Sequence, residues 1–280
     1  MSQVMDQTAA DAIKKLLSGG TELPVLPTVA VKILEELRSP QTNARRMAEF
    51  VSKDPVLASA VLRVANSALY GGRTEITDLP YAMVRIGLQQ VKNLVLALVL
   101  RSRMADPQVY GTVGAALMDH ALAVAFGSRL VADTIQCDAE QAFLCGLLHD
   151  FGRLALIKAL RDNAPKKAPL TPELMELVDQ HHTQAGALLA AHWRLPEMVA
   201  HVARHHHAPE RASEHQQMTC VVAFANQLAH RLGLGSDPDG TIDLVTLPAA
   251  QLLKLDEKAI DDLAGHLPGL FSTARAAMGA

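Results

Sequence analysis

The residues best suited to chemistry in this sequence are two neighbours, His149 and Asp150, in the segment Gly146-Leu147-Leu148-His149-Asp150-Phe151-Gly152. The pair offers an imidazole and a carboxylate from one turn of backbone. Such a carboxylate can bridge two metal ions while the imidazole binds one of them. Gly152 predicts a sharp turn directly after the pair. A single His-Asp pair is weak evidence for a metal site, so its value depends on companions.

Companion histidines are present in unusual number. The chain has 12 histidines but only 4% aromatic residues, and most of the histidines fall between His120 and His215. An imidazole binds metal when it is neutral. Gly186, one helical turn after His182, would let another group approach closely. The sequence predicts a metal site, functional or vestigial, for iron, manganese or zinc, with these candidate ligands: His120, His149, Asp150, His182, His206 and His207.

Other polar residues of this region have simpler interpretations. His201 and His205 are four residues apart on one helix face and could bind a metal by themselves. Arg153 could contact a phosphate, but we expect it on the surface. We also expect surface or loosely paired positions for the remaining histidines: His181, His192, His215, His230 and His266.

The elements that must position these side chains are predicted to be helices. Apolar residues recur every three or four positions, and no Asn-Gly hairpin signal separates alternating runs, so we expect an all-α fold. Asp54-Pro55, Asp78, Asp138 and Thr171-Pro172 provide helix starts. Further helices are predicted over 88–104, 115–132, 151–160 and 257–278.

Changes of pattern along the chain divide it into four parts. We predict an N-terminal helix over 1–22, an N-terminal helical bundle over 23–110, a helical core over 111–235 and a helical tail over 236–280. The amphipathic tail could close the core or join two chains in a homodimer.

Composition limits the partners and the compartment. The net charge of −3 provides no positive field for a phosphate backbone, which argues against nucleic acid. Arg45, Arg46, Lys92, Arg101 and Arg103 could form a local basic patch, although a solvated face mixed with acidic residues is the simpler interpretation.

Three cysteines without CxxC spacing predict buried thiols in a reducing cytoplasm. No secretory signal is apparent, and apolar runs such as 95–100 are far shorter than a membrane span, so we expect no membrane contact.

Several ordered motifs together resemble the HDOD proteins (HD-related output domain), a non-canonical branch of the HD phosphohydrolase superfamily in bacterial signalling. The resemblance runs from about Leu23 to Gly235 and rests on these segments: Leu23-Pro24-Val25-Leu26-Pro27, Asp54-Pro55-Val56-Leu57, Leu62-Arg63-Val64-Ala65-Asn66-Ser67, Ile86-Gly87, the segment around His149-Asp150, His182 to Gly186, Trp193-Arg194-Leu195-Pro196 and His206-His207-Ala208-Pro209.

This resemblance implies an N-terminal helical bundle packed on an HD-like helical core, a role in signal output, and no hydrolytic activity established as typical. The ligands of active HD enzymes match His120, His149 and Asp150, but the late aspartate position is Asn226. A neutral amide is a poorer metal ligand than a carboxylate. The ligand set is therefore degenerate there. No Gly-Tyr-Pro follows His206-His207, so the cyclic-dinucleotide phosphodiesterase branch is not supported.

Two functions follow as alternatives. The first is a regulatory module that acts by binding a signalling protein or a small molecule, with a degenerate metal site. The second is a metal-dependent phosphohydrolase or phosphodiesterase that uses the His/Asp cluster, in which bound cations lower the pKa of a water molecule. Asn226 and the large N-terminal bundle favour the first.

Overall fold

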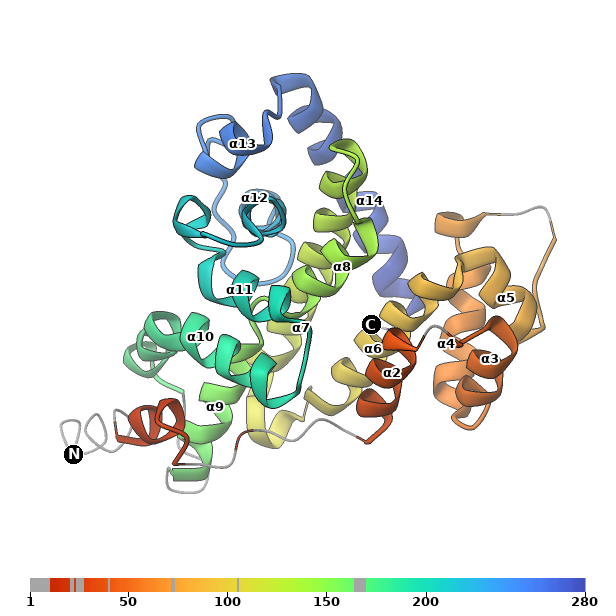
Figure 1. Cartoon of the computed structure of the whole chain (residues 1–280), viewed down its shortest axis with the longest axis horizontal. Coiled ribbons are helices and arrows are strands. Elements are labelled where there is room, and N and C mark those ends of the chain that lie inside the picture. Colours follow the sequence, from red (N-terminus) through yellow and green to blue (C-terminus); the bar gives the residue numbers. More distant parts are fainter. Residues whose placement is uncertain are drawn as a thin grey trace.

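The protein consists of α-helices joined mostly by short loops, as a computed structural model shows (Figure 1). The structure describes residues 11–20, 23, 28–39, 41–71, 74–104, 106–163 and 170–279. Within these ranges there is no strand. The predicted all-α fold is therefore confirmed.

The first group of helices forms a bundle that lies to one side of the molecule in Figure 1. Its helices begin where the sequence predicts: the Asp54 carboxylate accepts hydrogen bonds from the backbone of Val56 and Leu57, and Asp78 caps the helix that follows. The helices are α2 (Thr28–Arg38), α3 (Ala44–Val51), α4 (Pro55–Ala65), the short 3-10 helix η1 (Ala68–Tyr70), α5 (Leu79–Ile86) and α6 (Leu88–Met104).

Helix α3 was not among the predicted elements. It has only eight residues, so its periodicity is hard to detect. Its start signal is Asn43, whose side chain accepts a hydrogen bond from the backbone N–H of Arg46.

The second group of helices builds the core that carries the histidines. Its elements are α7 (Pro107–Thr134), α8 (Ala139–Leu148), α9 (Phe151–Asn163), α10 (Pro172–His192), α11 (Glu197–His205), η2 (Pro209–Arg211), α12 (Gln216–Arg231), α13 (Pro248–Leu253) and α14 (Glu257–Ala277). Asp138 caps α8 and Thr171 caps α10, as predicted.

Helix α7 is the central element of the core. It begins earlier than predicted and is kinked at Gly111, and it packs against α8, α12 and α14. By length and hydropathy alone, Val109–Thr134 could cross a membrane, which the short apolar runs of the sequence did not suggest. However, 61% of its apolar window is buried by other helices. This is typical of a core helix.

The two ends of the chain pack on parts of the fold that are distant in sequence. Helix α14 contacts both α7 and α4, and Arg63 on α4 donates a hydrogen bond to the backbone oxygen of Ala277 (2.9 Å). Ile13 and Leu17, near the start of the chain, face Leu177 of α10 across a small cavity. The tail thus closes the core of one chain, while the four-part division and the homodimer remain predictions.

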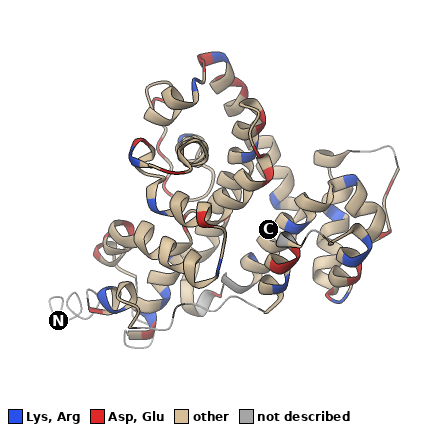
Figure 2. Ribbon diagram, viewed as in Figure 1, with Lys and Arg blue, Asp and Glu red and all other residues tan. Residues whose placement is uncertain are grey.

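Acidic and basic positions are interspersed along the helices (Figure 2). Arg45 pairs with Glu49, Arg46 pairs with Glu36, and Arg101 pairs with Asp119 at 2.8 Å. Lys92 is buried and donates to a backbone oxygen of α2. These contacts give four of the five residues of the suggested basic patch acidic or backbone partners, and the side chain of Arg103 lies outside the described part of the chain.

Candidate functional site

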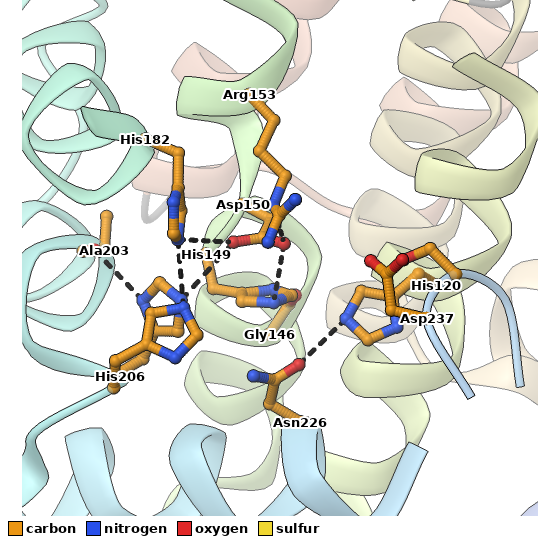
Figure 3. A network of polar contacts seen from close by, with 12 residues as sticks. His120, Gly146, His149, Asp150, Arg153, His182, Ala203, His206, Asn226 and Asp237 are labelled. Atoms are coloured by element: carbon orange, nitrogen blue, oxygen red, sulfur yellow. Dashed lines mark hydrogen bonds and ion pairs between the residues drawn. The ribbon is translucent and has the colours of Figure 1, made fainter. Parts of the chain in front are cut away.

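Five helices bring the predicted ligands to one buried place (Figure 3). His149 ends α8, and Asp150 lies in the turn before α9. The other members come from α7, α10, the residues directly after α11, and α12. Six of them are buried: His120, His149, Asp150, His182, His206 and Asn226. His207 is the exposed edge of the cluster.

Three of the histidines are held in the same way. In each, Nδ1 lies within hydrogen-bond distance of the backbone oxygen three residues earlier: His149 with Gly146 (2.7 Å), His182 with Asp179 (2.6 Å) and His206 with Ala203 (3.0 Å). A carbonyl can only accept, so each Nδ1 carries the proton and donates it. The lone pair is then on Nε2. Such a contact orients a metal-binding histidine.

These Nε2 atoms converge on the carboxylate of Asp150. The Nε2 atoms of His182 and His206 each lie 3.3 Å from Oδ1, and that of His149 lies 3.7 Å from Oδ2. Asp150 Oδ1, His149 Nε2 and His206 Nε2 are buried without a hydrogen-bond partner. Buried lone pairs without a donor are costly, and a divalent cation would satisfy them. The cluster therefore fits a metal ion.

His207 extends the cluster toward solvent. Its Nε2 lies 3.0 Å from Nε2 of His182. Because the proton of His182 is on Nδ1, His207 must donate in this contact. Asp150, His182, His206 and His207 have ligand atoms within 4.8 Å of one another and form the more complete half of the site.

Arg153 lies inside the site, and the prediction that it is a surface residue is wrong. Its Nε lies 2.9 Å from Asp150 Oδ2, and its guanidinium also pairs with Asp179 of α10. The residue is buried. The spacing of three positions after Asp150 on a helix was a signal for this ion pair. A protein cation thus already holds one oxygen of the carboxylate that would bridge two metals.

In the other half of the site, an imidazole and an uncharged amide contact each other. His120 Nε2 lies 2.8 Å from Asn226 Oδ1, so the imidazole donates to the amide and keeps its Nδ1 buried without a partner. The ring centroid of His230 lies 4.6 Å from that of His120. His230 is half-buried, which corrects its predicted surface position. Its place four residues after Asn226 on the same face of α12 was the signal for this.

The electrostatics favour neutral imidazoles around an ionised carboxylate. Burial lowers the pKa of His120 and of His182 to about 4 and lowers that of His149 well below its ordinary value. Burial would raise the pKa of Asp150, but the Arg153 guanidinium beside it holds the pKa well below its usual range. Neutral imidazole and ionised carboxylate are the states that bind metal.

Two glycines allow the helices to approach closely. A Cβ on Gly152 would lie 1.9 Å from the backbone oxygen of His182, and Gly186 lies against Ala203 and Gly152. Gly152 is in the first turn of α9 and has no positive φ. The predicted sharp turn is therefore wrong, and the role of Gly152 is contact between α9 and α10. The close approach predicted at Gly186 is present.

The remaining histidines lie outside the buried cluster. His192, His215 and His266 are exposed and His181 is half-exposed. His201 and His205 do share a face, with ring centroids 6.4 Å apart. Of the resembling segments, 24–27 lies outside the described residues. Asn66 of the segment 62–67 binds the backbone N–H and oxygen of Ile76, and so fixes the loop before α5.

Comparison with known proteins agrees with this geometry. Residues 23–209 match the HDOD domain. The chain belongs to the HDOD family. This HDOD chain is 30% identical over 226 residues to an uncharacterised protein of Treponema pallidum (strain Nichols), an alignment that covers 73% of this chain and 42% of the relative. The chain thus spans less than half the length of that relative.

Two solved structures show the same fold. One, from Shewanella amazonensis SB2B, has been proposed to be a metal-dependent phosphohydrolase; it superposes with a TM-score of 0.76 at 18% identity, covering 99% of this chain and 100% of the other. The second, a proposed signal transduction protein from Marinobacter aquaeolei VT8, has a TM-score of 0.71 at 23% identity, covering 99% of this chain and 65% of the other.

Proposed function

We propose that this HDOD chain is a regulatory module that transmits a signal by binding a protein or a small molecule, and that its HD-type cluster holds at most one divalent cation. The contact between Arg153 and Asp150 Oδ2 carries this proposal. A carboxylate that bridges two metal ions with one oxygen on each ion needs both oxygens free. Here the guanidinium takes one of them.

The single cation would be held by Asp150 Oδ1, His182 and His206, with His207 at the solvent side. Iron, manganese or zinc suits this mixture of imidazole and carboxylate. When bound, the ion supplies positive charge to the buried carboxylate and links the chain after α8 to α10 and α11. In this proposal its role is to fix the relative positions of these helices.

The alternative function is a metal-dependent phosphohydrolase or phosphodiesterase, in keeping with the description of the Shewanella amazonensis protein. Asn226 weakens this alternative, because its amide accepts from His120 and brings no negative charge to the second metal position. The site residues other than His207 are also buried, so a phosphate ester would have to enter beside His207.

Regulation by binding agrees with the description of the Marinobacter aquaeolei protein as a proposed signal transduction protein. Three free cysteines, two of them buried, suit a reducing compartment, and we place the protein in the cytoplasm. We expect no membrane and no nucleic acid among its partners.

The test is the metal content of untagged protein together with its hydrolytic activity. Two histidines of α10 give a matched pair: His182→Ala removes a buried ligand, and His192→Ala changes an exposed residue of the same helix. We expect the metal content to fall by at most one equivalent in His182→Ala and to stay unchanged in His192→Ala. We also expect no release of phosphate from phosphate monoesters and no opening of cyclic dinucleotides. Two equivalents of metal with turnover that disappears in His149→Ala would overturn the proposal.

A further inference from the structure

A second group of metal-binding side chains lies on the outer face of α11, away from the buried cluster. Glu197 and His201 share one face of this helix, and Glu214 reaches them from the segment between η2 and α12. His201 Nε2 lies 3.7 Å from Glu197 Oε1 and 3.5 Å from Glu214 Oε2. All three ligand atoms lie within 4.8 Å of one another.

Two further imidazoles border this group. The ring centroid of His215 lies 5.4 Å from that of His201, and the two rings are nearly perpendicular. The ring of His205 lies one helical turn away, at 6.4 Å. Three imidazoles and two carboxylates therefore gather where the loop before α12 meets α11.

The charges in this group are unbalanced. The two carboxylates repel each other at this separation. Arg204 is on the same helix, but neither glutamate is among its ion-pair partners within the described part of the chain. A divalent cation between the carboxylates would bind both and use the lone pair of His201.

We propose that Glu197, His201 and Glu214 form a surface site for a divalent transition metal, with zinc as the ion that suits it best. Zinc binds imidazole nitrogen and carboxylate oxygen and is most often four-coordinate. Three protein ligands leave a fourth position, which water or His215 can fill. The site is distinct from the buried cluster and does not depend on the function proposed above.

Zinc binding at this site would link two segments of the chain. Glu214 follows His201 by 13 positions, so the ion would close the loop that contains His206, His207 and η2. A ligand that binds only the folded state stabilises that state. Zinc would therefore clamp α11 to the start of α12.

The test uses the full-length untagged chain, stripped with a chelator and titrated with Zn²⁺ by calorimetry and thermal unfolding. Glu214→Gln and His201→Gln remove ligands of the surface site. Glu210→Gln is the matched control, because this nearby glutamate pairs with Arg211 and is not in the group. His182→Ala provides a background in which the buried cluster is impaired.

We expect zinc to raise Tm in the wild type, in Glu210→Gln and in the His182→Ala background. When Glu214→Gln or His201→Gln is combined with His182→Ala, which impairs the buried cluster, we expect Kd to rise at least about tenfold and the Tm shift to be lost. Glu214 is exposed and His201 is half-buried, so these substitutions should leave the fold of the unloaded protein intact. Equal zinc affinity of Glu214→Gln, His201→Gln and Glu210→Gln in the His182→Ala background would overturn the proposal, as would zinc binding that disappears with His182→Ala alone.

Discussion

The Nε atom of Arg153 lies 2.9 Å from Oδ2 of Asp150, and both residues are buried. The Arg153 guanidinium therefore gives this carboxylate the positive charge that a second metal ion would give it in a two-metal site. The other oxygen of the same carboxylate faces only imidazoles. This asymmetry of one carboxylate is the basis for the predictions on metal binding.

Replacing Arg153 by Met should free Asp150 Oδ2 and leave a buried carboxylate without its cation. Removing one partner of a buried ion pair costs about 3–5 kcal/mol, so the unloaded variant should unfold at lower urea concentration. Because the carboxylate then lacks a cation, Mn²⁺ or Zn²⁺ should bind more tightly and recover much of the loss. Arg211→Met, at an exposed arginine, should change neither quantity. Unchanged metal affinity in Arg153→Met would contradict the role given to this residue.

A second metal should bind only when both obstacles are removed. Asn226→Asp places a carboxylate beside His120, and Arg153→Met frees the bridging oxygen. We expect each single variant to hold at most one equivalent in the buried cluster and the double variant to hold two, as measured by metal analysis in a Glu214→Gln background. The Arg153→Met single variant, which keeps the isosteric amide of Asn226, is the control for size without charge. Two equivalents in Asn226→Asp alone would show that Arg153 is no barrier.

Gly152→Ala should disrupt the contact between α9 and α10. The added methyl would lie 1.9 Å from the backbone oxygen of His182, so the helices must separate. We expect a loss of about 3 kcal/mol or more in the free energy of unfolding, since overpacking costs about 1–3 kcal/mol even where side chains can adjust. Gly265→Ala in α14 meets open space and should be neutral or stabilise by up to about 1 kcal/mol. Similar denaturation midpoints for the two variants would refute the close contact.

Stability should fall as the pH is lowered below about 6.5. His120 and His182 have a pKa of about 4 in the folded protein and 6.5 in the unfolded chain. Between these values the unfolded chain binds protons that the folded protein does not. The free energy of unfolding therefore decreases by roughly 1.4 kcal/mol per pH unit for each histidine.

Urea unfolding of chelator-treated protein at pH 7.5, 6 and 5 measures this dependence. His182→Gln should make it shallower, whereas His266→Gln, at an exposed residue bonded only to its own helix, should leave it unchanged. Equal stability at pH 7.5 and pH 5 would show that these imidazoles are not held neutral by burial.

The sequence predicted elements whose signals are local. Asp54, Asp78 and Asp138 mark helix starts because a carboxylate binds the free N–H groups of the first turn. The candidate ligands could also be named from the sequence, because they lie in an ordered set of motifs. Arg153 and His230 were misplaced because their burial depends on α10 and α7, which approach them only in the folded chain. The spacing from Asp150 to Arg153 and from Asn226 to His230 indicates a shared helix face, but the burial of that face depends on other helices.

The hydrogen bond from Arg63 to the backbone of Ala277 joins residues 214 positions apart. During synthesis the N-terminal bundle emerges from the ribosome long before its partner on α14 exists. Until then α4 exposes the surface that α14 later covers, and a chaperone or an assembling partner could bind there. The same contact means that a domain fused after α14 would be coupled to the bundle at the opposite end of the chain.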